Sequence, residues 1–283
     1  LWRSEGEPYY REQLTAILEE IEQTADIDWT WMSTFGYKSP LYNWLFSELY
    51  LDAWLEFGDQ ALLDTCGSIV DGFKSSAIYD YANDNFGQSA NANFFSYLAI
   101  ERYLAVTASV DSELTDIATA AFNYALSMYN ETTAEWYYSK AEQSIGKYDS
   151  HAAYYHLLMV QVFLDYLGDI DSPTDQNITY IKERVPAMVD DAVVDELNPS
   201  GAFWYTTEIT DYTESAATVL LALELLDLYY GLDHTGYKSA AIETIISRQM
   251  YNGNFWGSDG QQITDLWWGD EIAAYLPKYL YLQ

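Results

Sequence analysis

Cysteine is almost absent from this sequence, since Cys66 is the only one among 283 residues. A single cysteine cannot form a disulfide within the chain, and it cannot supply a CxxC pair for a metal. Cys66 lies in the helical pattern LLDTCGSIVDGF, which predicts a small core residue. The sequence therefore excludes a disulfide-stabilised fold and a thiolate metal site.

Basic residues are scarce as well. The chain has 12 Lys and Arg against 44 Asp and Glu, and its formal net charge is −32. Nucleic acids and anionic membranes are bound by clustered cations, so we expect neither as a partner. Such a chain repels itself at low salt, and salt shortens the Debye length from ~10 Å at 0.1 M to ~3 Å at 1 M. The charge favours a halophilic, archaeal protein, and an acidic protein from an ordinary source is the alternative.

Long apolar runs are also missing. The longest, AATVLLALELLDLYY, is interrupted by Glu224 and Asp227, so we expect no membrane insertion. The start, LWRSEGEPYYREQL, lacks the pattern of a signal peptide, and we expect a mature or trimmed chain. Asn-x-Thr sequons at Asn130 and Asn177 permit a glycosylated, secreted protein, although two sequons also fit chance. We expect an extracellular or cell-surface location.

The sequence does contain a helical repeat. Four apolar segments recur along it: YNWLFSELYLDAWLEFGD, NFFSYLAIERYLAVTASVD, HAAYYHLLMVQVFLDYLGD and SAATVLLALELLDLYYGLD. Gly58, Gly168 and Gly231 fit the left-handed position after a helix, and the Asp that follows fits a cap of the next helix. A more amphipathic helix and a long aromatic loop follow each segment, so the repeat predicts buried and outer helices in alternation.

This alternation predicts an all-α fold, an α/α toroid. We expect an incomplete barrel of about five inner/outer helix pairs, with residues 1–283 forming a single domain. A linear helical solenoid is the alternative, but its inner helices need not be apolar all round. No alternating strand pattern persists, so a large sheet is not expected.

In a toroid the long loops and the starts of the inner helices lie at one end, around one cavity. Aromatic faces stack on sugar rings, and Asn, Asp and Glu bind hydroxyl groups, so we expect a polysaccharide cleft. The alternative is that these Trp and Tyr residues fill loop cores. The predicted substrate-binding residues are Trp44, Asn91, Trp136, Trp204, Tyr205, Asp211, Glu214, Trp256, Trp268, Asp270 and Glu271. No cofactor and no metal site is implied, although a structural cation held by carboxylates stays open.

The stretch YDSHAAYYHLL holds two of the three histidines. On a helix His151 and Tyr155 share a face, whereas His156 lies about 140° round the axis from His151. The two histidines therefore cannot ligate one metal ion from a regular helix. His151 and Tyr155 are candidates for an acid–base pair. His156 precedes an apolar run, so it is either a third catalytic candidate or a core histidine.

Two segments at successive predicted inner helices carry a family resemblance. SANANFF and AEQSIGKYDSHAAYYH resemble motifs of the α/α-toroid polysaccharide lyases, the heparinase II/III-like and alginate-lyase-like groups, over residues 40–170. The resemblance implies that Asn93 neutralises a uronate carboxylate. It also implies that Tyr155, with His156 or His151, abstracts and returns protons during β-elimination.

Two other functions stay open beside the lyase. A glycoside hydrolase needs two carboxylates ~5–5.5 Å or ~6.5–9.5 Å apart, which Asp211, Glu214, Asp270 and Glu271 could supply. A non-catalytic glycan-binding or structural module of a cell or virus surface would share the aromatic cleft. A polyuronate lyase needs cations near the cleft, and the sequence offers only Arg102, Lys140 and Lys147 there. We favour an enzyme over a binding module, and a lyase over a hydrolase.

Overall fold

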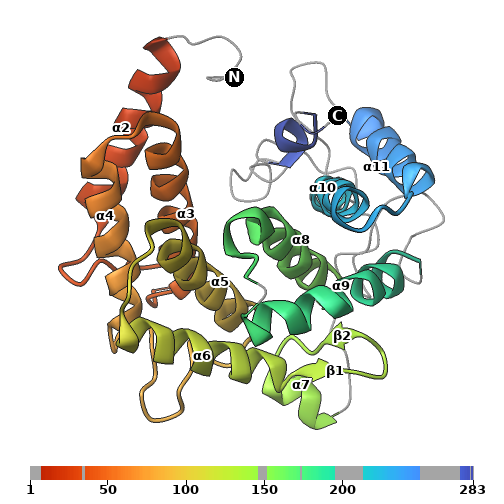
Figure 1. The fold of residues 1–283 in the computed structure, drawn as a ribbon, viewed down its shortest axis with the longest axis horizontal. Coiled ribbons are helices and arrows are strands. Elements are labelled where there is room, and N and C mark those ends of the chain that lie inside the picture. Colours follow the sequence, from red (N-terminus) through yellow and green to blue (C-terminus); the bar gives the residue numbers. More distant parts are fainter. Residues whose placement is uncertain are drawn as a thin grey trace. The chain divides into compact units, whose positions relative to one another are not determined.

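The computed structural model describes residues 8–33, 36–145, 152–172, 174–194, 213–248, 275–280 and 282. The elements in this part are mainly helices (Figure 1): α2 (Pro8–Thr24), α3 (Pro40–Phe57), α4 (Gln60–Asp71), η1 (Gly72–Lys74), α5 (Ala90–Thr107), α6 (Ser112–Leu126), α7 (Lys140–Ile145), α8 (Ala152–Ile170), α9 (Gln176–Val194), α10 (Thr213–Tyr230) and α11 (Thr235–Arg248). A short antiparallel hairpin joins β1 (Tyr129–Asn130) to β2 (Glu135–Trp136). The predicted all-α class is confirmed.

The chain divides into two compact units. The first contains residues 1–87 and 92–124, and the second contains residues 88–91 and 125–283. The single domain expected from the sequence stays a prediction.

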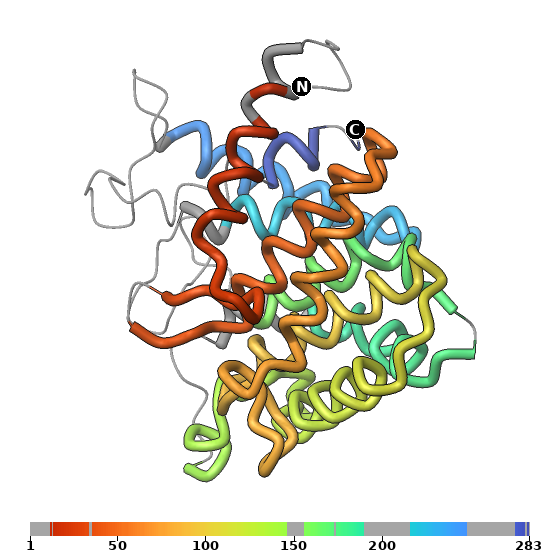
Figure 2. Tube along the Cα trace, turned by 90° about the vertical axis from the view of Figure 1, so that its left-hand side faces the viewer, coloured from red at the N-terminus to blue at the C-terminus, as the bar shows by residue number. Residues whose placement is uncertain are grey.

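In the first unit α3 packs along α4, and both Figures 1 and 2 show the two helices side by side. The Ser39 hydroxyl caps α3 by accepting the N–H of Leu41 at 3.3 Å, and Gly58 ends it with a φ of 68°. The Asp59 carboxylate then accepts the N–H of Ala61 at 3.0 Å and caps α4. The predicted Gly-Asp turn is therefore confirmed at this point.

The outer helix α6 buries one stripe of side chains. Its members are at most 3% exposed: Ile117, Ala121, Phe122 and Ala125. Met128, two residues after the end of the helix, is buried as well. The inner helix α5, by contrast, is buried on every side between Ala90 and Ile100. The predicted contrast between an inner helix that is apolar all round and an amphipathic outer helix is confirmed for this pair.

In the second unit α8 packs against α9 and α10, and α10 packs against α11. Gly231 ends α10 with a φ of 66°, as predicted. The prediction for Gly168 is wrong, because α8 continues to Ile170 and the N–H of Asp171 still bonds the carbonyl of Leu167 at 2.9 Å. The helical hydrogen bonds therefore extend past this glycine.

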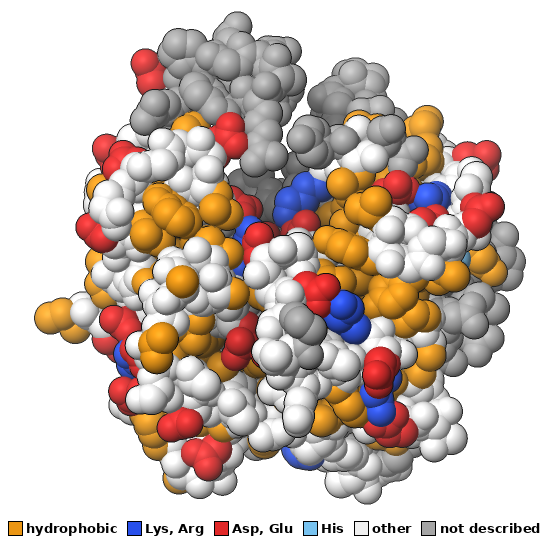
Figure 3. Space-filling model, in the orientation of Figure 1, with side chains coloured by type: hydrophobic (Ala, Val, Ile, Leu, Met, Phe, Trp, Pro, Cys, Tyr) orange, Lys and Arg blue, Asp and Glu red, His pale blue; other side chains and the backbone are white. Residues whose placement is uncertain are grey.

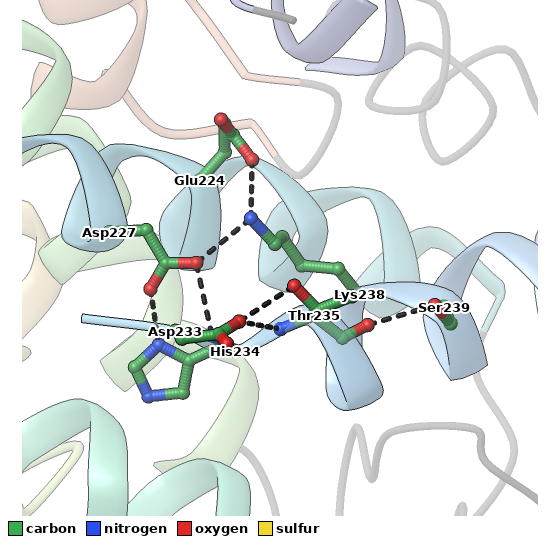
Figure 4. A network of polar contacts seen from close by, with 7 residues as sticks. All are labelled: Glu224, Asp227, Asp233, His234, Thr235, Lys238 and Ser239. Carbon is green, nitrogen blue, oxygen red and sulfur yellow. Dashed lines mark hydrogen bonds and ion pairs between the residues drawn. The ribbon is translucent and has the colours of Figure 1, made fainter. Parts of the chain in front are cut away.

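A network of polar side chains joins α10 to α11 (Figure 4). Lys238 contacts Glu224 at 2.7 Å and Asp227 at 2.8 Å, and the Asp227 carboxylate also accepts from the ring of His234 at 2.5 Å. Burial alone would raise the pKa of Asp227, but the hydrogen bonds from Lys238 and His234 outweigh burial and lower it. The network fixes the turn between the two helices.

The surface carries scattered acidic side chains. On the face shown in Figure 3, Asp and Glu residues lie singly or beside a Lys or Arg and do not form one continuous patch. Among the helices that the structure describes, none is both long and apolar enough to cross a membrane. The same part of the chain contains no cluster of three metal-ligating side chains.

Candidate functional site

In the second unit the start of α5 lies against the chain that follows β2. The N–H of Ala90 donates to the carbonyl of Tyr138 at 2.8 Å, and Ser89 forms a bridge with Ser139. The N–H of Tyr138 donates in turn to the carboxylate of Glu142 at 3.0 Å. The Glu142 carboxylate is 8% exposed and therefore buried. Through the backbone of Tyr138, it is linked to the first turn of α5. Glu142 belongs to the segment AEQSIGKYDSHAAYYH, and the sequence gave no reason to expect that its side chain is buried.

Asn91 follows directly in this first turn. It is 3% exposed, and its side-chain oxygen has no hydrogen-bond partner among the described residues. A buried acceptor without a donor costs about 1–3 kcal/mol, so such an oxygen indicates a place for a donor from elsewhere. Trp136, also a predicted binding residue, is 3% exposed and packs against Tyr129 with ring centroids 5.0 Å apart. Its burial fits the alternative in which Trp fills a loop core.

His156 lies inside the second unit, on α8. It is 2% exposed, and its Nε2 donates to the carbonyl of Met188 on α9 at 3.0 Å. The carbonyl can only accept, so Nε2 carries the proton, and Nδ1 has no partner in the described part of the chain. Burial lowers the pKa of His156 to about 4, which keeps the ring neutral near pH 7. Of the two interpretations offered by the sequence, the core histidine matches this environment.

The predicted site residues of the first unit are engaged in packing. Trp44 is 5% exposed and stacks on Phe95 with ring centroids 4.2 Å apart. Asn93 is fully buried; its oxygen accepts the N–H of Phe86 at 2.8 Å and its nitrogen donates to the carbonyl of Gly87 at 3.0 Å. Asn93 thus holds the loop that precedes α5, and this favours a positioning role over contact with a substrate.

Two of the cations expected near a cleft are paired with other groups. Arg102 is 8% exposed and contacts Asp52 at 2.6 Å in the first unit. Lys140, in the second unit, donates to the carbonyl of Ser127 at 3.2 Å and to Gln143 at 3.1 Å. Burial lowers the pKa of Lys140. Neither residue adds support for a polyanionic substrate.

The remaining predicted site residues cannot be placed by their side chains. Tyr155 lies in α8 and Glu214 in α10, but only their backbone is described. Eight others lie outside the described residues: His151, Trp204, Tyr205, Asp211, Trp256, Trp268, Asp270 and Glu271. Their roles stay predictions.

The structure adds a carboxylate that the sequence did not mark, Asp28, in the loop ahead of α3 in the first unit. The Asp28 carboxylate accepts from Ser75 at 2.5 Å, Thr30 at 2.7 Å and Lys38 at 3.0 Å. Burial would raise the pKa of Asp28, but these hydrogen bonds outweigh it and lower that pKa strongly. The loop so fixed leaves Tyr37 59% exposed. No motif marks this carboxylate in the sequence.

Comparison with known proteins gives matches only at the level of structure. No family model matches the sequence, and no curated protein matches it significantly. A polysaccharide lyase is similar with a TM-score of 0.72 and 14% identity, over 99% of this chain and 87% of that one. A glycosyl hydrolase family 88 protein from Bacteroides vulgatus is similar with a TM-score of 0.70 and 12% identity, over 93% and 79% of the two chains.

A third similar structure is the unsaturated glucuronyl hydrolase from Bacillus sp. GL1. Its TM-score is 0.58 and its identity 12%, over 92% of this chain and 73% of that one. These structures are α/α toroids. The chain has the α/α toroid fold. The expected resemblance to toroid carbohydrate-active enzymes is confirmed as a distant one, and the linear solenoid is not supported.

Proposed function

We propose that this chain is a carbohydrate-active enzyme that binds a polysaccharide at the N-terminal ends of its inner helices α8 and α10 and cleaves it by β-elimination. The observation that carries the proposal is the structural similarity to a polysaccharide lyase over 99% of the chain. Fold alone does not determine activity, so the argument also depends on the residues at these helix ends.

The proposed reaction uses Tyr155 of α8 and His151, which precedes α8 in the sequence. Tyr155 removes the proton next to the uronate carboxylate, the bond to the leaving oxygen breaks as a double bond forms, and His151 returns a proton to that oxygen. His151 and Tyr155 are four residues apart in the sequence, the spacing at which two side chains share one face of a helix. His156 has no part in this scheme, because its ring is buried and neutral.

The carboxylate of the substrate needs a hydrogen-bond donor. The family resemblance assigns this role to Asn93, but both ends of its amide are bonded to the loop at residues 86–87. We assign the role to Asn91 instead, two residues earlier in the same motif. Its amide nitrogen would donate to the uronate, and its unpartnered oxygen would accept a sugar hydroxyl.

Hydrolysis is the second candidate. Two of the similar structures are hydrolases, and one of them is named for unsaturated glucuronyl residues, which carry the double bond that lyases create. A hydrolase would use a pair from Asp211, Glu214, Asp270 and Glu271, one as general acid and the other as base or nucleophile. We propose the lyase first because of the Tyr155 and His151 pair.

One experiment distinguishes the two reactions. The protein in about 2 M salt, where charge repulsion is screened, is incubated separately with uronate polysaccharides and with unsaturated uronyl oligosaccharides. A lyase increases the ultraviolet absorbance of the first substrate, and an unsaturated uronyl hydrolase decreases that of the second. Reducing ends without an absorbance change indicate ordinary hydrolysis.

Variants then assign the residues. We expect Tyr155→Phe to abolish the rise in absorbance and Tyr237→Phe, on the outer helix α11, to leave it unchanged. Glycan binding without any cleavage by the wild-type protein would reject an enzyme and favour a binding module. We also propose that the protein is halophilic, because its net charge is −32. We further propose that it is extracellular, because the sequence carries two Asn-x-Thr sequons.

A further inference from the structure

The two Asn-x-Thr sequons lie in different local structures. The first, Asn130-Glu131-Thr132, occupies the end of β1 and the turn that leads to β2. The second, Asn177-Ile178-Thr179, lies in the first turn of α9. Asn130 and Asn177 are both partly exposed, and Thr132 and Thr179 are both exposed, so accessibility does not separate the sequons. Their backbone conformation does.

A sequon is defined by an amide and a hydroxyl two residues apart, so a glycosyltransferase must contact both groups at once. In the hairpin turn the side-chain oxygen of Asn130 accepts the N–H of Thr132 at 2.9 Å. This bond folds the asparagine side chain back over the threonine and brings the two residues of the sequon together.

The hairpin turn is held in place from the neighbouring helix α9. Glu131, between the two sequon residues, accepts from the guanidinium of Arg184 at 3.1 Å and from the hydroxyl of Tyr180. Arg184 also lies over the Tyr180 ring, 3.4 Å from its centroid. The central residue of the sequon is thus directed toward α9, and these contacts stabilise the observed conformation of the turn.

The second sequon is locked in a helix. Residues two apart on a helix lie about 200° round its axis and do not share a face. The Asp175 carboxylate caps this turn by accepting the N–H groups of Asn177 at 2.8 Å and Ile178 at 3.1 Å. The hydroxyl of Thr179 donates to the carbonyl of Asp175 at 2.8 Å and is therefore already used. A transferase could contact Asn177 and Thr179 together only after the first turn of α9 unwinds.

We infer that Asn130 is an N-glycosylation acceptor of the folded chain and that Asn177 is not. In the reaction the amide nitrogen of Asn130 loses a proton and bonds the anomeric carbon of a lipid-phosphate-linked oligosaccharide. The bond from that carbon to the phosphate oxygen breaks, and the lipid phosphate leaves with the electron pair. The site fits an extracellular protein, but it does not depend on which glycan the protein itself cleaves.

The test uses the purified full chain with an oligosaccharyltransferase and a lipid-linked oligosaccharide, and peptide mass spectrometry measures the occupancy of each site. We expect the folded chain to carry about tenfold more glycan at Asn130 than at Asn177, because the capped turn of α9 must open first. Denaturing the acceptor should remove this preference. Thr132→Val should abolish transfer to the folded chain, and the matched Thr179→Val should not change it.

Several outcomes would overturn the inference. Equal occupancy of both sites in the folded chain would mean that the helix does not protect Asn177. Modification of Asn177 alone, or of neither site while the denatured chain is modified, would mean that the hairpin turn is not an acceptor. A denatured chain that is modified at neither site would show that the sequon is not recognised at all, and it would also reject Asn130.

Discussion

The buried histidine of α8 should make stability depend on pH in a way that one variant can isolate. His156 is 2% exposed and neutral in the folded protein, with its pKa lowered to about 4 by burial, whereas its ordinary value is 6.5. The unfolded chain therefore takes up a proton between these two values and the folded chain does not. Stability is fully present above pH 6.5, falls as the pH drops below it, and levels off below the folded pKa of about 4.

The magnitude follows from the two pKa values. Each pKa unit is worth ~1.4 kcal/mol, so the fall from 6.5 to about 4 corresponds to about 3 kcal/mol in total. About 2 kcal/mol of this should be lost between about pH 7.5 and pH 5. Many carboxylates also titrate near pH 5, so the contribution of His156 must be measured as the difference in stability between the wild type and a variant.

His156→Gln provides that difference. The amide nitrogen of Gln can reach the position of Nε2 and donate to the carbonyl of Met188, but it does not titrate. Urea unfolding in constant high salt, followed by tryptophan fluorescence, gives the free energy of unfolding of both proteins at each pH. We expect the advantage of the wild type to shrink by about 2 kcal/mol between about pH 7.5 and pH 5. A constant difference would refute the buried, neutral histidine.

Four further predictions concern stability, and the first three are measured by urea unfolding. Lys238→Met leaves Glu224 and Asp227 without the lysine that pairs with both, and it should lower the free energy of unfolding by about 3 kcal/mol. A much smaller loss would mean that the network does not stabilise the fold. Gly72→Ala should cost about 3 kcal/mol, because its Cβ would lie 2.5 Å from the carbonyl of Trp29. At Gly58 an added Cβ has no atom within 4 Å, and only the φ of 68° is unfavourable, so Gly58→Ala should cost only about 1 kcal/mol. Equal losses of stability in Gly72→Ala and Gly58→Ala would contradict this reasoning. The midpoint of thermal unfolding should rise steeply between low salt and about 2 M salt, and a flat response would reject a halophilic protein.

The fold could be predicted from the sequence because the buried side of a helix requires apolar residues at a regular spacing. The stripe of α6 and the all-round apolar α5 differ in pattern, and both helices bury the side chains that these patterns predict. Glycine after a helix was informative at Gly58 and Gly231 but not at Gly168, where the hydrogen bonds of α8 simply continue. A glycine does not force a helix to end; it only permits the turn.

The candidate site was less predictable, because residue type does not encode which groups a side chain contacts. Trp44, Trp136 and Asn93 have the composition of a sugar site, yet their side chains are buried against Phe95, Tyr129 and the loop before α5. The role of Asp28 depends on Ser75, which lies 47 residues away in the sequence. Such contacts arise from tertiary structure alone.

The most direct test of the central claim is whether the protein creates a double bond in a uronate polysaccharide. Wild type, Tyr155→Phe and Tyr237→Phe are compared in about 2 M salt by ultraviolet absorbance, and mass spectrometry identifies the product ends. The account predicts unsaturated ends with the wild type and Tyr237→Phe, and none with Tyr155→Phe. Saturated ends from the wild type, or equal activity of Tyr155→Phe, would contradict β-elimination by this tyrosine.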